Sequence, residues 1–443
     1  MVSGTMALVA LLIAVFLIIF LTAKLKMNAF MVLILVSFIY GFLVKMPLDV
    51  ITKNIHNGFG NTLGYIGVVI IAGTIMGIVL EKTGAAFSMT NFILKLVSKK
   101  YPQLALSISG YITSIAVFCD SGFVILNSIN KALAKKSKLS ITVTSTALAT
   151  GLFASHCLIP PATGPIAAAN IMGANLGEVM IYGAITAFFA MMTGFLWATF
   201  FAKRFYIEPR MTESYEDLMQ KYGKLPPVAL SFMPIGVPIL LILADAIASP
   251  KLGILPQGEY IKLLNFFGDP MVALIIGAML SLLLVRRENL SKAINEWFTE
   301  GIKRAALIVA ITGAGGAFGQ ILKASPIGDF LSSSLSQISI GIFLPFIISA
   351  ALKISQGSST VALLTSASIV MPLLGPLGIN PALAVVAVGA GAMTFSHAND
   401  SYFWVVTQFS DMDTKTAYKV FTTATLLEGC ASMCVVAVLS LFF

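Results

Sequence analysis

The sequence predicts an all-α protein that crosses a membrane many times, and three observations support this fold class. Hydrophobic residues make up 58% of the 443 residues and charged residues only 11%, whereas a soluble domain has roughly 25% charged residues. Apolar runs of roughly 20 residues, the length that a helix needs to cross a bilayer, recur along the whole chain. Polar stretches that contain glycine or proline interrupt this apolar sequence at only a few points.

Ten apolar runs are long enough to be interpreted as spans. In chain order they are residues 5–22, 28–45, 64–81, 141–158, 178–202, 229–248, 270–285, 305–322, 381–396 and 417–443. The first run has no preceding charged segment and no small-residue cleavage site, so we interpret it as a retained span and not as a signal peptide.

Two further apolar segments, at about 102–136 and 338–372, are each broken near the middle by polar residues. Each arm of the first segment has only about 15 to 17 residues, which is short for a full span. Lysines stand both before and after this segment, and lysine and arginine gather on the cytoplasmic side of membrane proteins. Both ends therefore lie on the same side, and we predict that each broken segment is a re-entrant hairpin.

Threading the chain on this basis places the N-terminus outside and 22 of the 28 lysines and arginines inside. The inside segments are 23–27, 82–101 with 131–140, 203–228, 286–304 and 410–419. The positive-inside bias thus explains the formal net charge of +9. We therefore expect a lipid bilayer around this protein and no nucleic-acid partner.

The polar segment 203–228 divides the chain near its middle and is predicted to be a cytoplasmic linker. It separates a first transmembrane repeat, residues 1–202, from a second repeat, residues 229–443. Each repeat contains five spans and one hairpin. Because five is an odd number, the second repeat must be inverted in the membrane relative to the first. Inverted repeats with broken helices that meet at mid-membrane are typical of secondary transporters.

Polar breaks at matching places support the two repeats. Gly122 in the first hairpin corresponds to Gly357 in the second at an offset of 235 residues, and Ser155-His156 corresponds to Ser396-His397 at an offset of 241. Irregular backbone survives in a bilayer only where it lines a cavity or is buried in protein. Paired breaks in the two halves therefore indicate the substrate site of a transporter.

The hairpin tips and helix breaks supply groups that bind anions. A helix end at mid-membrane presents unpaired N–H groups and a partial positive charge, and nearby hydroxyls add hydrogen-bond donors. Lys353 stands just before the second tip; it either balances the charge of a substrate carboxylate, or pairs with a carboxylate such as Asp120 or Asp400, or snorkels. The predicted substrate-binding residues are Ser121, Gly122, His156, Thr163, Lys353, Gly357, Ser358, Ser359, Thr360, His397 and Asn399.

Four residues are candidates for carrying a coupling proton: Asp120, His156, His397 and Asp400. Intramembrane carboxylates mark ion or proton pathways, and these two are equally suited to ligate sodium or to cap the helices at the breaks. Imidazole titrates in the physiological range, although a buried histidine is often structural. Glu428 lies near the end of a span, and we expect an interfacial or packing role for it.

The sequence argues against an enzyme and against a cofactor or metal site. Serine and histidine are adjacent in both Ser-His pairs, and neighbours in sequence rarely form a nucleophile–base pair. The four cysteines lie in apolar segments without the spacing of a zinc site or a disulfide framework. The glycines of 313–319 lie inside an apolar span and lack the strand of a nucleotide-binding fingerprint, so they indicate close helix packing.

At these motifs the chain resembles the gluconate permease (GntP) family of bacterial sugar-acid transporters over essentially its whole length. The residues that carry the resemblance are Gly58-Phe59-Gly60-Asn61-Thr62-Leu63-Gly64, the tip from Phe118 to Phe123, Pro160-Pro161-Ala162-Thr163-Gly164-Pro165, Gly268-Asp269-Pro270, Gly357-Ser358-Ser359-Thr360-Val361-Ala362 and Phe395-Ser396-His397-Ala398-Asn399-Asp400. The resemblance implies a multi-pass protein of the bacterial inner membrane that imports a small hydroxy-carboxylate with protons. D-Serine as the substrate and sodium as the coupling ion are the alternatives.

The family resemblance also implies a fold and an assembly. The wider ion-transporter superfamily has two inverted repeats, two hairpins and an elevator motion, usually in homodimers. Three positions depart from the gluconate-type pattern: Asp120-Ser121 replaces Glu-Val at the first tip, Ala162-Thr163 replaces His-Pro, and Lys353 replaces an arginine. These changes fall at the predicted site, so a smaller or differently substituted hydroxy acid is as plausible as gluconate.

Overall fold

The described part of the chain folds into helices and contains no strand. The computed structural model describes residues 2–96, 101–209, 225–248, 259–327, 330, 341–398 and 400–443. Most of the predicted linker 203–228 and the first residues of the second hairpin, 338–340, lie outside this range. The all-α class predicted from the apolar runs is confirmed.

The helices of the first half follow the predicted spans closely. In chain order they are α1 (Gly4–Ile19), α2 (Ala29–Leu43), α3 (Leu48–Lys82), α4 (Ala85–Leu96), α5 (Pro102–Thr113), α6 (Cys119–Lys136), α7 (Ile141–Leu158), α8 (Thr163–Met172) and α9 (Leu176–Phe200). A π-helical turn, Phe20–Lys24, continues α1, and a 3-10 turn, Ala202–Arg204, follows α9.

The second half has a similar succession of long and short helices. They are α11 (Val228–Ala248), α12 (Glu259–Gly268), α13 (Pro270–Ser281), α14 (Leu290–Lys292), α15 (Phe298–Lys323), α17 (Phe343–Gln356), α18 (Ser359–Val370), α19 (Pro381–Met393), α20 (Ser401–Phe409), α21 (Thr414–Ala417) and α22 (Thr423–Leu439). Short 3-10 or π-helical turns join several of them: Leu282–Leu284, Arg287–Asn289, Ala293–Trp297, Met371–Leu373 and Tyr418–Thr422.

Helix α3 is much longer than the predicted span 64–81. It begins at Leu48 and bends by 42° between its two parts, which meet near residue 65. Polar side chains such as Asn54 lower the hydropathy of its first part, so hydropathy alone placed the start of the span too late. Close packing against α15 accounts for the longer helix. At Gly58 the two helices approach so closely that a Cβ atom would lie only 2.5 Å from the Gly316 carbonyl oxygen of α15.

A second bend, of 66°, separates α12 from α13. The Asp269 side chain accepts hydrogen bonds from the backbone N–H groups of Met271 (2.9 Å) and Val272 (3.3 Å). Pro270 occupies the first helical position, where its missing N–H costs nothing. The Gly268-Asp269-Pro270 motif therefore ends one helix and starts the next by a capping aspartate followed by proline.

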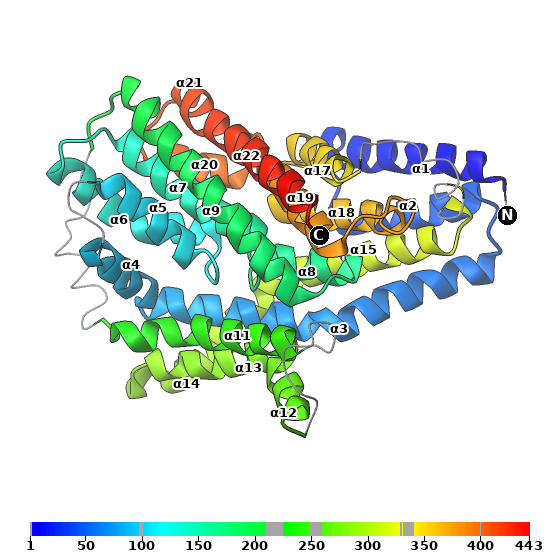
Figure 1. The fold of residues 1–443 in the computed structure, drawn as a ribbon, viewed down its shortest axis with the longest axis horizontal. Helices are drawn as coiled ribbons and strands as arrows, with labels where there is room; N and C mark the ends of the chain where they lie inside the picture. The colour runs from blue at the N-terminus through cyan, green and yellow to red at the C-terminus, as the bar shows by residue number, and fades with distance from the viewer. Residues whose placement is uncertain are drawn as a thin grey trace.

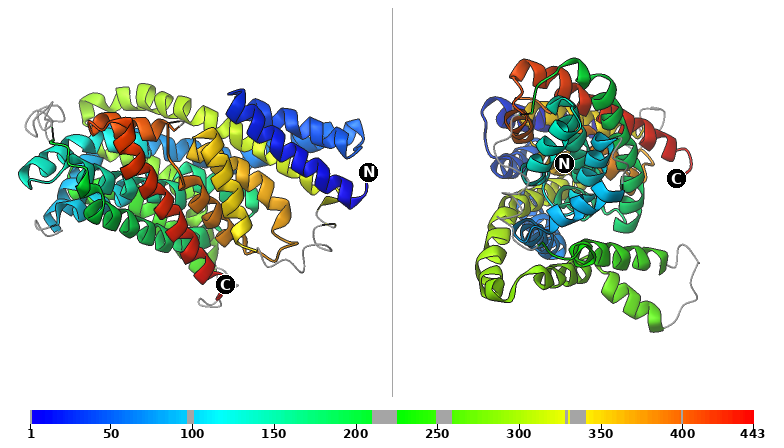
Figure 2. Two further views of the ribbon diagram at one scale, coloured as in Figure 1. Left: turned by 90° about the horizontal axis from the view of Figure 1, so that it is seen from above. Right: turned by 90° about the vertical axis from the view of Figure 1, so that its left-hand side faces the viewer.

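Two long helices, α3 and α15, lie side by side along the molecule (Figure 1). Helix α2 packs on α15 and helix α13 packs on α3, and α12 projects from one side of the molecule (Figures 1 and 2). In the rest of the molecule α7 packs between α5 and α9, and α19 packs between α17 and α22. We call α3 with α15 the central helix pair.

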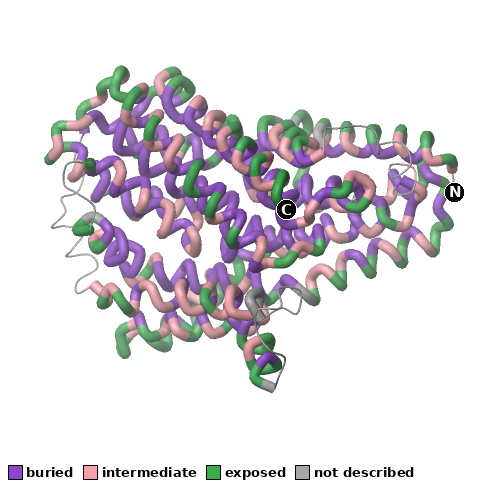
Figure 3. Tube along the Cα trace, viewed as in Figure 1, coloured by how far each residue is buried: buried purple, intermediate pink, exposed green. Residues whose placement is uncertain are grey.

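Helix α7 is buried along its whole length, and α19 is buried from its second residue onward (Figure 3). The break after α7 is buried with its helix, whereas the break after α19 is partly exposed, at Phe395 and Ala398. By length and composition, five described helices are able to cross a membrane, or seven if each bent pair counts as one span. The described part therefore has the multi-pass organisation predicted from the sequence.

Candidate functional site

The first feature of the site is a buried ion pair between the second hairpin and the break after α19. The Lys353 side chain, at the C-terminal end of α17, is 0% exposed, and its Nζ lies 2.6 Å from Asp400 Oδ2. The same Nζ also donates to the Gly357 carbonyl oxygen and to Ser359 Oγ (3.1 Å). The Phe153 ring of α7 lies beneath the ammonium, 5.4 Å from Nζ to the ring centroid.

Asp400 is equally well bonded. Its Oδ2 accepts from the Ser396 hydroxyl as well as from Lys353, and its Oδ1 accepts from the Tyr402 backbone N–H (3.1 Å) at the start of α20. Asp400 thus caps α20 and neutralises Lys353 at once. A buried ion pair persists only with hydrogen bonds of this kind, because taking two charges out of water is expensive.

Glycine is required at the second hairpin tip. Gly357 ends α17 with φ of +85°, a conformation that L-residues with a side chain rarely adopt. This turn brings the Gly357 carbonyl back onto Lys353, and Ser358 then caps α18 by accepting from the Val361 backbone N–H (3.3 Å). The Gly357-Ser358-Ser359 sequence therefore builds the tip around the lysine.

A second carboxylate, Asp120, stands close to this ion pair in the first turn of α6. The charges of Asp400 and Lys353 act on Asp120, and the Ser401 side chain interacts with it. Its Oδ1 is buried and has no hydrogen-bond partner in the described part of the chain. The start of α6, the turn between α17 and α18 and the break before α20 therefore meet around Lys353.

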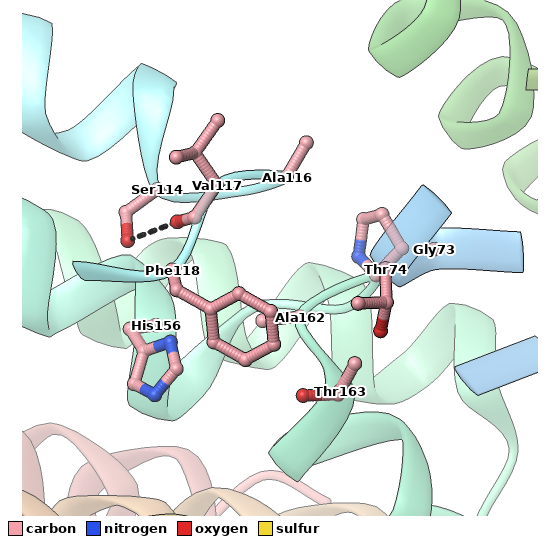
Figure 4. A pocket seen from close by; sticks show the side chains of 10 residues that line it. Gly73, Thr74, Ser114, Ala116, Val117, Phe118, His156, Ala162 and Thr163 are labelled. Atoms are coloured by element: carbon pink, nitrogen blue, oxygen red, sulfur yellow. Dashed lines mark hydrogen bonds between the residues drawn. The ribbon is translucent and has the colours of Figure 1, made fainter. Parts of the chain in front are cut away.

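A pocket next to this cluster lies between α3 and the helix breaks of the first half (Figure 4). Its lining residues are Gly73, Thr74, Ser114, Ala116, Val117, Phe118, His156, Pro161, Ala162 and Thr163. The empty volume is about 260 Å³. Most of this volume is narrow space between the lining atoms and open solvent, and the cavity itself measures only about 20 Å³. A cavity of this size holds about one water, so the pocket must widen to admit a small organic acid.

Two helix N-termini beside this pocket have no side-chain cap. Helix α6 begins after Phe118 and helix α8 begins after Ala162, and neither of these residues accepts a hydrogen bond from the first turn with its side chain. Uncapped N-termini present free N–H groups and a partial positive charge. By contrast, Ser358 and Asp400 cap the corresponding helices α18 and α20 of the second half.

Two polar side chains of the pocket come from the α7–α8 region. Thr163 is 5% exposed, and its Oγ1 has no hydrogen-bond partner among the described residues. His156 is 6% exposed, its ring lies 6.0 Å from that of Phe118, and the charges of Lys353 and Asp400 act on it. In Figure 4 both side chains border the space beneath Phe118.

The other two hydroxyls of the pocket lining are already engaged. Thr74 Oγ1 donates to the Ile70 carbonyl oxygen (2.8 Å), and Ser114 Oγ donates to the Val117 carbonyl oxygen (3.0 Å). Thr163 is therefore the hydroxyl of this lining whose proton is not used inside the described protein.

Several predicted site residues lie elsewhere or serve packing. Ser121 Oγ lies 3.5 Å from Arg304 Nη1 of α15, and a Cβ atom at Gly122 would lie 2.7 Å from the Leu152 side chain. Thr360 is half-buried in the first turn of α18, and His397 Nε2 contacts the Ile354 carbonyl oxygen at 3.0 Å. Asn399 lies outside the described residues.

One charged network escaped the sequence analysis, and the role of one acidic residue needs correction. Arg304 joins Glu81 (3.2 Å) and Glu300 (2.6 Å), so it links both members of the central helix pair to the first tip through Ser121. The spacing of four residues from Glu300 to Arg304 was a detectable signal for this network. Glu428 is 0% exposed, so of the two roles expected for it the interfacial one is wrong and the packing one remains. Among the described residues no group of three His, Cys, Asp or Glu side chains forms a metal site.

Comparison with known proteins relates this geometry to membrane transporters. A model of the GntP family permeases matches residues 6–442. The high-affinity gluconate transporter of Escherichia coli K12 is 30% identical over 435 residues, which cover 97% of each chain. The D-serine transporter DsdX of the same strain is 33% identical over 430 residues, which cover 96% of each chain. An uncharacterised permease of Haemophilus influenzae is 36% identical over 415 residues, which cover 90% of this chain and 84% of that one.

Two solved structures share the fold. The YdaH transporter of Alcanivorax borkumensis has a TM-score of 0.65 at 15% identity and covers 89% of this chain and 90% of its own. MtrF of Neisseria gonorrhoeae, described as one of a class of antimetabolite efflux pumps, has a TM-score of 0.65 at 14% identity, covering 88% and 84%. At these identities the similarity concerns the fold alone.

Proposed function

The chain belongs to the GntP family of permeases, and from this premise we propose that it imports a small organic acid by proton symport across the bacterial inner membrane. The proposed substrate is gluconate, a related sugar acid or another hydroxy-carboxylate. D-Serine is the second substrate class, because relatives named for gluconate and for D-serine are similar to nearly the whole chain. All these substrates carry a carboxylate, and its recognition is the common requirement.

The observation that carries the proposal is the pair of uncapped N-termini of α6 and α8 beside one pocket. Free backbone N–H groups and the helix dipoles favour an anion there. The unpartnered Thr163 hydroxyl offers a further donor at the start of α8. A carboxylate placed between these groups would satisfy donors that the described protein leaves unused.

The remaining predicted residues take supporting roles in this proposal. His156 borders the pocket and is suited to hydrogen-bond a substrate hydroxyl or carboxylate. Lys353 is fully buried and held by Asp400, so we assign it to shaping the second tip. The other predicted residues complete the proposed site when the tips approach the substrate. They are Ser121, Gly122, Gly357, Ser358, Ser359, Thr360, His397 and Asn399.

For the coupling ion, the proposal retains Asp120, His156, His397 and Asp400 as proton carriers. Asp120 is the best placed of these, because one of its oxygens is buried without a partner close to both Lys353 and Asp400. Sodium coupling on the same fold is the alternative. Replacing sodium by choline at constant pH distinguishes the two, since only a sodium-coupled carrier loses uptake.

The proposed transport movement is a shift of the hairpin cluster against the central helix pair, in a chain built as two inverted repeats and assembled as a homodimer. Similarity in fold to two solved transporters supports this view. The breaks occur in the same order in both halves, which supports the repeats. The break between α5 and α6 matches that between α17 and α18, and the break between α7 and α8 matches that between α19 and α20.

Counterflow in proteoliposomes tests the proposal. Vesicles containing the purified protein are loaded with unlabelled gluconate, lactate or D-serine and diluted into the labelled compound. We expect transient accumulation of at least one of the three, and net uptake that a protonophore abolishes when a pH gradient drives it. Absence of counterflow for all hydroxy acids, sugar acids and D-serine would overturn the transporter proposal for these classes.

A further inference from the structure

Glu428 is a carboxylic acid that the structure buries completely in α22. The side chain is 0% exposed, and neither Oε1 nor Oε2 has a hydrogen-bond partner among the described residues. It lies within an apolar helix that is long enough to cross a membrane, residues Thr414–Leu439. Every other buried charge near the hairpin tips has at least one partner, as the pair of Lys353 and Asp400 illustrates.

The helices around α22 bring no cation to Glu428. Helix α19 has no titratable side chain, and on α9 Tyr182 faces the far end of α22, where its ring contacts Phe443. Lys353 of α17 is held by Asp400, and Lys419 of the preceding π-helical turn lies over the Phe205 ring.

The remaining titratable groups on this side are His156 and Cys157 of α7, Tyr402 of α20 and Tyr418 before α22. Cys157 and Tyr402 interact with Glu428 electrostatically. The Tyr402 hydroxyl donates to the Ala149 carbonyl oxygen (2.9 Å), so its proton is engaged elsewhere. Tyr418 lies at Ala398, where its hydroxyl accepts from the backbone N–H.

An ionised carboxylate without a cation or a donor is very unfavourable in such surroundings, whereas the protonated acid carries no charge. Ionisable residues inside a membrane protein mark proton or ion pathways by default. From these contacts we propose that Glu428 is a proton-binding site of the transport cycle. The inference rests on the proposed function, because a transporter is what makes reversible proton binding useful here.

In this proposal Glu428 holds a proton in the conformation seen and releases it to water when a conformational change opens α22 to an aqueous path. The reaction is the simple dissociation of the acid to carboxylate and proton. Asp400 is less suited to this role, because its carboxylate already accepts three hydrogen bonds, one of them from the Lys353 ammonium.

A direct structural path joins Glu428 to the ion pair. Thr425 lies three residues earlier on the same face of α22, and its Oγ1 accepts from the Ser396 backbone N–H (3.1 Å). Thr422 donates to the Ser396 carbonyl oxygen (2.6 Å), and the Ser396 hydroxyl donates to Asp400. A charge appearing at Glu428 therefore acts on the helix that holds the break before α20 in place.

The first test compares the wild type with Glu428→Gln, an uncharged side chain of the same shape that resembles the protonated acid. We expect the variant to retain substrate counterflow and to lose accumulation driven by a pH gradient. With one proton per substrate and a gradient of one pH unit, the wild type accumulates substrate up to about 10-fold. In the variant the substrate concentrations inside and outside the vesicle should stay nearly equal. Glu178→Gln, at the half-exposed start of α9, is the matched control and should behave as the wild type does.

If Glu428→Gln accumulates substrate as the wild type does, the assignment is overturned. It is also overturned if the variant loses both counterflow and accumulation, because that result indicates a role in folding or substrate binding. A second measurement needs no substrate. Infrared spectroscopy of the purified protein should show a carbonyl band of a protonated carboxylic acid that disappears in Glu428→Gln. An unchanged band would refute the proposal even if none of the tested acids is the substrate.

Discussion

Lys353 and Asp400 form an ion pair of 2.6 Å in which the two side chains are only 0% and 4% exposed. This pair joins the C-terminal end of α17 to the N-terminal end of α20, although 47 residues separate them in the chain. The Asp400 countercharge explains why a buried positive charge is tolerated at the second tip, and it makes the tip depend on the break before α20.

Removing the lysine should destabilise the protein strongly. Lys353→Met leaves Asp400 buried without its countercharge, and breaking a buried pair in this way costs about 3–5 kcal/mol. The measurement is the melting temperature of the purified protein in detergent. Lys292→Met is the control, because Lys292 and Glu296 are more than half exposed and 4.0 Å apart, and exposed pairs contribute about 0–1 kcal/mol. Equal melting temperatures for the two variants would contradict the structural role of the buried pair.

Substrate affinity should depend on the Thr163 hydroxyl. Thr163→Val removes a hydrogen bond to the substrate carboxylate, which is expected to weaken binding by about 1.5–3 kcal/mol, or roughly 10- to 100-fold. Stability should not fall, because Thr163 Oγ1 has no partner in the described protein without substrate. Isothermal titration with the substrate found by counterflow measures the affinity, and Thr163→Ser should restore it. Unchanged affinity in the valine variant would remove Thr163 from the site.

Glycine at position 357 should be necessary for the second tip. Gly357→Ala places a side chain at φ of +85°, and strain of this kind costs about 1–3 kcal/mol. Thermal unfolding checks the change. The matched control is Gly375→Ala, where nothing lies within 4 Å of the new Cβ atom, so stability should stay the same or rise slightly. The prediction fails if both variants unfold at the same temperature.

The inverted orientation of the second repeat predicts that position 375 faces the outside of the cell. A Gly375→Cys variant, made after the exposed cysteines Cys430 and Cys434 are replaced, should react with a membrane-impermeant maleimide added to intact cells. A Glu288→Cys variant in the same background should react only after the membrane is permeabilised. The reverse pattern would overturn the predicted topology.

The local features of this fold could be predicted from the sequence because they depend on local composition. Apolar runs place α1, α2, α7, α9, α11 and α22 within a few residues, since desolvation of backbone in a bilayer leaves a helix as the stable form. The tips at Gly122 and Gly357 and the breaks after α7 and α19 were equally visible as polar interruptions. Helix α3 was underestimated, because packing against α15 extends it through polar sequence.

By itself the sequence determined that the chain is a multi-pass helical protein with paired polar breaks and a charged residue before the second tip. Only the tertiary structure decided that Lys353 pairs with Asp400, that α6 and α8 begin uncapped beside one pocket, and that Glu428 is buried without a partner. The physical reason is that hydropathy is a property of each segment. Hydrogen-bond partners and burial instead depend on which segments, far apart in the chain, pack together.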